Sequence, residues 1–159
     1  MKNLKVIRKK RGYTQAQLAQ FLHVGNSTVC RWELGTTQPD LYQILKICHV
    51  LDCMPSQLYD DIPCSMMPVF DIYGNIVSTC NISEELRLYE CCFGLSMPHD
   101  ISARINCGDT GFFSFGNTAE HNCVVIAYDK NCNGCIDFCQ NISNDMQIFA
   151  VCRSVYIKI

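Results

Sequence analysis

The segment TQAQLAQFLHVGNSTVCRWEL, residues 14–34, predicts two short helices joined by a tight turn. Thr14 is a favourable N-cap for the first helix, because its hydroxyl can accept a hydrogen bond from a backbone N–H of the first turn. Leu18, Ala19 and Leu22 recur at helical spacing and predict one buried face. This segment therefore predicts a helix that packs one apolar face against the rest of an N-terminal domain.

The turn HVGN and the second helix follow. We expect Gly25 to adopt a positive φ and Asn26 or Ser27 to cap the second helix, which runs to about Leu34 and ends at Gly35. Val29 and Trp32 should face inward. The outward face then carries short polar side chains and one arginine: Asn26, Ser27, Thr28 and Arg31.

The sequence around this pair of helices resembles the lambda-repressor-like (Xre) helix-turn-helix domain. The resemblance runs from Leu4 to Leu58, through LKVIRKKRGYTQAQLA, STVCRWELGTTQPD and LYQILKICHVLDCMPSQL. The residues in register are Thr14-Gln15, Leu18-Ala19, Glu33, Gly35 and Pro39. An ordinary helical hairpin is the alternative interpretation, but such a hairpin would not require these residue types at these spacings.

The resemblance implies double-stranded DNA as the partner, since a helix of this kind fits the major groove. The exposed face and the family's contact positions together assign base reading to Asn26, Ser27 and Arg31. The same positions assign the DNA backbone to Gln15, Thr28 and the loop residues Thr36, Thr37 and Gln38.

Three more helices complete a predicted five-helix domain at residues 1–59. The first covers residues 2–11, with Leu4 and Ile7 toward the core. Asp40 should cap a helix that continues to Val50, and a short helix over residues 55–59 closes the domain.

The net charge of −2 conceals a division along the chain. Residues 1–59 carry eight lysines and arginines against three acids, a net charge of +5, whereas residues 60–159 carry five against twelve, a net charge of −7. Only the basic part is suited to nucleic acid. No apolar run is long enough to span a membrane, and polar sequence stands where a signal peptide would have its apolar core, so we expect a cytoplasmic protein.

Residues 60–68 contain two prolines and predict a linker, and residues 69–159 predict a mostly β domain. The fold class is thus α+β. Only residues 83–92 suggest a helical turn. Short runs rich in valine, isoleucine and aromatic residues predict strands at 69–73, 111–115, 123–128, 146–152 and 154–159.

The second domain resembles the C-terminal domain of LexA-like and phage repressors, through DISARINCGD at residues 100–109 and the strand VVIAY at 124–128. That family cleaves itself with a serine nucleophile and a lysine base. At the matching positions this chain has Asp100 and Asp137, and neither carboxylate can perform the serine step. Ser102 and Lys130 are nearby but out of register, and no Ala-Gly cleavage site occurs. We therefore expect no enzyme activity and no catalytic residues.

Thirteen cysteines are unusual for this length. The odd count and a DNA-binding domain favour free thiols that pack as small apolar residues. Zinc or iron–sulfur binding and a redox pair remain alternatives. If a metal binds, its first ligands should come from the cluster Cys132, Cys135 and Cys139, but no cofactor is expected.

These features predict a transcriptional regulator, of repressor type, that binds operator DNA as a homodimer. The C-terminal domain should mediate self-association through a strand such as SVYIKI, residues 154–159, and could receive a regulatory protein. The alternatives are a self-cleaving repressor peptidase and a thiol- or metal-sensing regulator.

Overall fold

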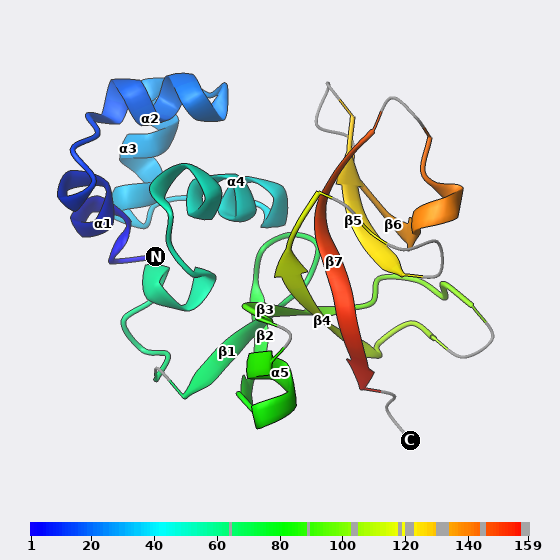
Figure 1. Ribbon diagram of the computed structural model, residues 1–159. Helices are drawn as coiled ribbons and strands as arrows, with labels where there is room; N and C mark the ends of the chain where they lie inside the picture. Colours follow the sequence, from blue (N-terminus) through cyan, green and yellow to red (C-terminus); the bar gives the residue numbers. More distant parts are fainter. Residues whose placement is uncertain are drawn as a thin grey trace.

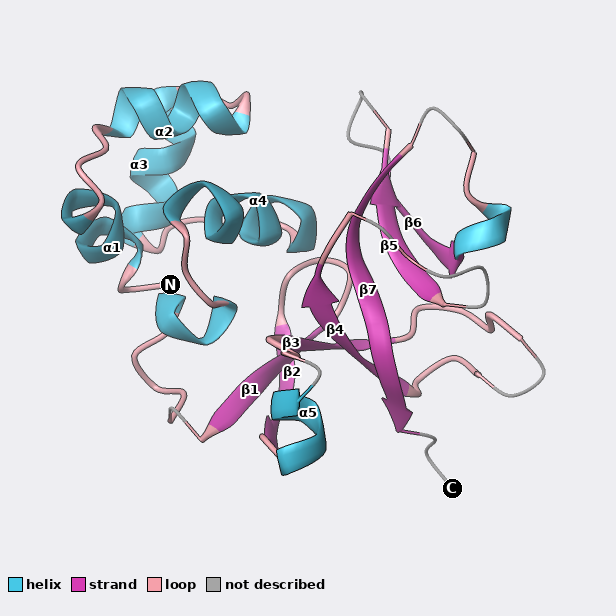
Figure 2. Cartoon of the chain, viewed as in Figure 1, coloured by secondary structure: helices cyan, strands magenta, loops and turns pink. Residues whose placement is uncertain are grey.

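The protein is a bundle of helices docked against a single β-sheet in the computed structural model (Figure 1). The structure describes residues 1–63, 65–88, 90–102, 105–117, 119, 123–129, 134–143 and 146–156. Most of the helices come first in the chain and lie on one side of the molecule; the strands, with two further short helices among them, follow on the other side (Figure 2). This arrangement confirms the α+β fold class.

The N-terminal domain contains four α-helices and one 3-10 helix. They are α1 (Leu4–Lys10), α2 (Gln15–Leu22), α3 (Asn26–Leu34), α4 (Leu41–Leu51) and the 3-10 helix η1 (Pro55–Leu58). The fifth predicted helix is thus a 3-10 turn. None of the helices in the described ranges combines the length and apolarity needed to cross a bilayer.

Helix α4 forms where the sequence predicts it. Its N-cap Asp40 accepts a hydrogen bond from the backbone N–H of Gln43 at 2.8 Å. The apolar residues of α4 recur at helical spacing and are buried: Leu41, Ile44, Leu45, Ile47, Cys48 and Leu51. Because these residues cover more than one side of the helix, α4 can contact both the other helices and the sheet.

In the C-terminal domain, the described residues form a seven-stranded sheet in the order β2-β1-β3-β4-β7-β5-β6. All neighbouring strands are antiparallel except β1 and β3. The strands are β1 (Met66–Phe70), β2 (Ile76–Asn81), β3 (Phe93–Ser96), β4 (Thr110–Phe115), β5 (Val124–Tyr128), β6 (Gly134–Phe138) and β7 (Gln147–Tyr156); α5 (Glu84–Leu88) and the 3-10 helix η2 (Cys139–Asn141) interrupt them.

Several strand predictions require correction. Strand β1 begins at Met66, inside the predicted linker, because pairing with β2 and β3 incorporates Pro68 and its neighbours into the sheet. The predicted strands 146–152 and 154–159 are one strand, β7. This strand lies between β4 and β5, so the segment SVYIKI does not form an edge strand of the sheet; its residues 157–159 lie outside the described part of the chain.

One apolar core runs through both domains. The side chain of Tyr59 contacts Phe70 with ring centroids 6.2 Å apart, and Phe93 stacks on Phe113 at 5.6 Å. On the other side of the junction, Tyr42 of α4 contacts Tyr128 of β5 at 4.1 Å. Buried residues of helices α1–α4 and of the sheet therefore share one cluster, with α4 at the junction (Figure 1), and a smaller second cluster combines Leu86 of α5 with Met67, Cys91 and Phe112.

Candidate nucleic-acid interface

Helix α2 is fixed at its start by a reciprocal pair of hydrogen bonds. The backbone N–H of Gln17 donates to Thr14 Oγ1 at 3.1 Å, and the N–H of Thr14 donates to Gln17 Oε1 at 2.8 Å. This capping box satisfies two backbone groups that the helix leaves unpaired. Leu18, Ala19 and Leu22 are buried, as the sequence predicts, so α2 has a defined rotation about its axis.

The turn between α2 and α3 differs from the prediction in which residue takes the positive φ. His23 adopts the left-handed conformation, with φ of 55°, as the C-cap of α2. Gly25 has φ of −72° and is the N-cap of α3. Asn26 and Ser27 therefore belong to the first turn of the helix and do not cap it. A glycine cap supplies no side-chain acceptor, so the first N–H groups of α3 receive no side-chain cap.

Helix α3 presents a buried face and an exposed polar face. Val29 and Trp32 are buried, which confirms their predicted direction. Gly35 ends the helix with φ of 74°. On the opposite face, Asn26, Ser27 and Arg31 are exposed and Thr28 is half-buried.

A buried ion pair connects α1 to α3. Arg8 Nε lies 2.5 Å from Glu33 Oε1, and its second contact with the same carboxylate is 3.0 Å. The Arg8 guanidinium also donates to the carbonyl of Tyr13 at 2.7 Å. The hydrogen bond with Glu33 raises the pKa of Arg8. This pair was not predicted from the sequence, although Arg8 lies one helical turn after the buried Leu4 and hence on the apolar side of α1.

Gln15 is held against the same carboxylate. Its Nε2 donates to Glu33 Oε2 at 2.7 Å, which orients the amide at the start of α2. Burial raises the pKa of Glu33, but the hydrogen bonds from Arg8 and Gln15 outweigh burial and lower it below the ordinary value. A glutamine amide has two N–H donors, so one remains for another acceptor.

The loop after α3 closes the candidate surface. Thr36 Oγ1 donates to the carbonyl of Arg31 at 3.2 Å, so this hydroxyl helps to satisfy the C-terminal end of α3. Thr36, Thr37 and Gln38 are all exposed, and the loop ends at the buried Pro39. The predicted contact residues therefore lie on α2, α3 and the loop that follows, on elements fixed by caps and by the Arg8–Glu33 pair.

Residues 4–58 match the family model described as helix-turn-helix. This segment is a helix-turn-helix domain. The match supports a role in DNA binding and regulation of transcription, and it ends at Leu58, before the sheet. No curated protein matches the chain. The solved structure described as "Crystal Structure of FeII HppE" is 15% identical over 94% of this chain and 88% of that chain, with a TM-score of 0.33.

Outside the helix-turn-helix domain, the two positions that match the dyad each form hydrogen bonds with residues near them in the chain, Asp100 in a loop and Asp137 near the end of β6. Asp100 Oδ1 accepts a hydrogen bond from the backbone N–H of Cys107 at 2.7 Å. Asp137 Oδ1 accepts from the N–H of Phe138 at 2.6 Å and from Asn141 Nδ2 at 2.9 Å. Among the hydrogen bonds of the described residues, none joins the two carboxyl groups. Lys130 lies outside the described residues.

The cysteine cluster is described in part. Cys132 lies outside the described residues. Cys135 Sγ lies 3.8 Å from Met146 Sδ, and Cys139 Sγ lies 3.8 Å from the carbonyl oxygen of Ala119. Within the part of the chain that the structure describes, no three histidine, cysteine, aspartate or glutamate side chains gather closely enough to hold a metal ion.

Proposed function

We propose that the protein is a sequence-specific repressor of transcription that binds operator DNA as a dimer. The observation that carries the proposal is the division of α3 into a buried face, Val29 and Trp32, and an exposed polar face. A helix that is held rigidly and presents short polar side chains and one arginine outward is suited to the major groove. As a regulator of genomic DNA, the protein would act in the cytoplasm of the cell.

We assign base reading to Asn26, Ser27 and Arg31. An asparagine amide can pair with adenine, and an arginine guanidinium with guanine. Arg31 suits this role because it is exposed and makes no ion pair with any described residue.

We assign the DNA backbone to Gln15, Thr28 and the loop Thr36–Gln38. The free N–H of the Gln15 amide can donate to a phosphate while Glu33 holds the other one. Since Thr36 already donates to the end of α3, we expect Thr37 and Gln38 to provide most of the loop's side-chain contacts.

A binding experiment tests the proposal. In vitro selection from a random duplex pool should yield one preferred operator, whose affinity is then measured by fluorescence anisotropy. Arg31→Ala should lose roughly 1–3 kcal/mol at one base position and relax its sequence preference. Arg87→Ala is the matched control, because it removes the same charge from an exposed site on α5. If Arg31→Ala and the unaltered chain had equal affinity and equal base preference, the proposed placement of α3 in the major groove would be wrong.

A further inference from the structure

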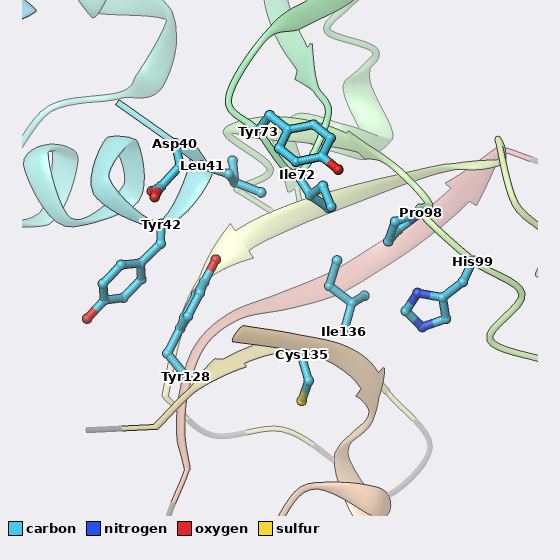
Figure 3. A pocket seen from close by; sticks show the side chains of 10 residues that line it. All are labelled: Asp40, Leu41, Tyr42, Ile72, Tyr73, Pro98, His99, Tyr128, Cys135 and Ile136. Atoms are coloured by element: carbon cyan, nitrogen blue, oxygen red, sulfur yellow. The ribbon is translucent and has the colours of Figure 1, made fainter. Parts of the chain in front are cut away.

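A cavity of about 440 Å³ lies between the helix-turn-helix domain and the sheet (Figure 3). Its walls come from both domains: the start of α4, the turn between β1 and β2, the segment after β3, and strands β5 and β6. The volume is that of a small-molecule site. None of the residues assigned to DNA contact lines it.

The lining combines aliphatic side chains with aromatic rings. Leu41, Ile72, Pro98 and Ile136 provide the apolar surface. Tyr42, Tyr73 and Tyr128 provide rings, and Figure 3 shows them projecting from three different segments around the cavity. Such a lining accommodates a ligand with an apolar body.

The lining contains one carboxylate and one imidazole. Asp40 is the only carboxylate among the described residues that line the cavity, His99 is the only histidine, and no lysine or arginine is among them. Asp40 Oδ1 accepts a hydrogen bond from the N–H of Gln43. An ionised carboxylate has about four acceptor positions on its two oxygens, so this cap leaves acceptor capacity. The Asp40 carboxylate therefore favours a cation over an anion at its end of the cavity.

The aromatic rings favour the same charge. A cation is attracted to the face of a tyrosine ring. The chain already contains one example at the margin of this site, where Lys46 Nζ lies 4.8 Å from the ring centroid of Tyr42. Tyr73, which is 72% exposed, offers further ring surface to the cavity, whereas the Tyr128 ring already packs on Tyr42 at 4.1 Å.

The turn that carries Ile72 and Tyr73 is held in place. Asp71 Oδ1 accepts hydrogen bonds from the N–H groups of Tyr73 and Asn75, both at 2.9 Å, and Asp71 Oδ2 accepts from Asn75 Nδ2 at 2.8 Å. Ile72 and Tyr73 are nevertheless 40% and 72% exposed. A fixed turn that exposes two large apolar side chains beside a cavity is a preformed wall for a ligand.

We infer that this cavity is a binding site for a small organic cation with an aromatic body, of the arylalkylamine type. The ammonium group would lie near Asp40 and a tyrosine ring, and the aromatic body would lie against the aliphatic lining. The inference does not depend on which DNA sequence the helix-turn-helix domain recognises, and its test uses the free protein.

Isothermal titration of the full chain with three probes of similar size tests the charge preference. The probes are 2-phenylethylamine, 2-phenylethanol and 3-phenylpropanoate, which are cationic, neutral and anionic at neutral pH. The amine should bind about tenfold more tightly than the alcohol, and the carboxylate more weakly than both. Failure of the amine to bind at millimolar concentration, or equal affinity for the amine and the carboxylate, would overturn the inference.

Variants then locate the site. Asp40→Asn keeps an effective N-cap for α4 but removes the charge, so the amine affinity should fall to that of the alcohol. Asp60→Asn is the matched control, because this carboxylate lies outside the cavity, near Lys2, and its loss should leave amine binding unchanged. Tyr73→Ala should lower the binding affinity for both the amine and the alcohol. An unchanged thermal midpoint identifies folded variants, and unchanged amine binding by folded Asp40→Asn would overturn the assignment.

Discussion

The Arg8–Glu33 pair is the residue-scale feature on which the candidate interface depends. The two side chains are only 7% and 2% exposed. Burying either charge without its partner would therefore lower the free energy of unfolding. Glu33→Gln removes the charge that compensates the buried guanidinium, and it also loosens Gln15. We expect the free energy of unfolding to fall by roughly 3 kcal/mol, measured by urea denaturation.

An exposed ion pair in the same domain provides the control. Arg11 Nη2 lies 3.1 Å from Asp52 Oδ2, but the Asp52 side chain is 90% exposed. Asp52→Asn should therefore cost less than about 1 kcal/mol. Similar losses for the two variants would show that burial of the Arg8–Glu33 pair does not matter.

The same pair predicts a dependence of stability on pH. Burial raises the pKa of Glu33, but the bonds from Arg8 and Gln15 and the charges of Arg8 and Lys5 lower it overall. A folded-state pKa below the unfolded value of about 4.3 stabilises the protein above that pH, and this stabilisation is lost as the pH falls through the folded-state pKa. The stability difference between the unaltered chain and Glu33→Gln should be constant near neutrality and shrink below about pH 4. A difference that grew on acidification would contradict this sign.

Residue-scale features that depend on near neighbours in the chain were predictable. Thr14 and Asp40 cap their helices as predicted, because each cap is set by residues within three positions. The Arg8–Glu33 pair joins residues 25 positions apart, and a local reading assigns such an arginine to the solvent. The positive φ is found at His23 and not at Gly25, because Gly25 is the N-cap of α3 and has an extended backbone conformation there.

At the scale of elements, the turn between β1 and β2 holds the sheet against the helix-turn-helix domain. Gly74 has φ of 84°, and a Cβ added there would lie 2.5 Å from the carbonyl oxygen of Pro39. Gly74→Ala should therefore impose a left-handed strain of about 1–2 kcal/mol and also push the turn away from the start of α4. We expect a loss of unfolding free energy beyond 2 kcal/mol, measured by urea denaturation, and faster proteolysis near residues 71–75.

Gly108→Ala is the matched control for this strain. Gly108 also has a positive φ, 91°, but an added Cβ would meet no atom within 4 Å. Gly108→Ala should therefore lower the free energy of unfolding by only about 1–2 kcal/mol, the strain of an alanine in the left-handed conformation. If Gly74→Ala and Gly108→Ala lowered the free energy of unfolding equally, the close approach of Gly74 to the Pro39 carbonyl would not contribute to the packing of the two domains.

The strands show why sequence predicts some elements of the sheet and not others. β5, VVIAY, is a continuous apolar run that is buried, so composition alone reveals it. β2 is an exposed strand at the edge, and β6 begins with glycine and contains Asp137. In β3, Gly94 is needed because a Cβ would lie 2.9 Å from Val69 Cγ2. β2 and β6 each pair with the preceding strand, and β3 pairs with β1 and β4; this pairing, and not an apolar or alternating pattern of their own, makes the three segments strands.

At the scale of the whole molecule, self-association requires a free surface. Because β7 is interior, the edges of the sheet are β2 and β6, and β2 exposes Val77 by 54%. We expect a dimer at tens of micromolar in sedimentation experiments. Val77→Lys should weaken it, since a charged side chain opposes edge pairing. Leu88→Lys, at a 78% exposed site on α5, is the control. A monomer with and without operator DNA would exclude the proposed dimer.

The chain should not cleave itself, because its residues at the two positions that match the dyad oppose a serine–lysine mechanism. Asp100 and Asp137 provide neither a nucleophilic hydroxyl nor an amine. Asp100 accepts a hydrogen bond from the N–H of Cys107, and Asp137, in β6, accepts from Phe138 and Asn141. Ser102, the nearest hydroxyl in sequence, accepts a hydrogen bond from the backbone N–H of Ile105 at 3.2 Å. Incubation at alkaline pH, where a lysine base would lose its proton, should leave one full-length band on a denaturing gel. Two discrete fragments that disappear in Ser102→Ala would instead establish an active peptidase with a different pair of residues.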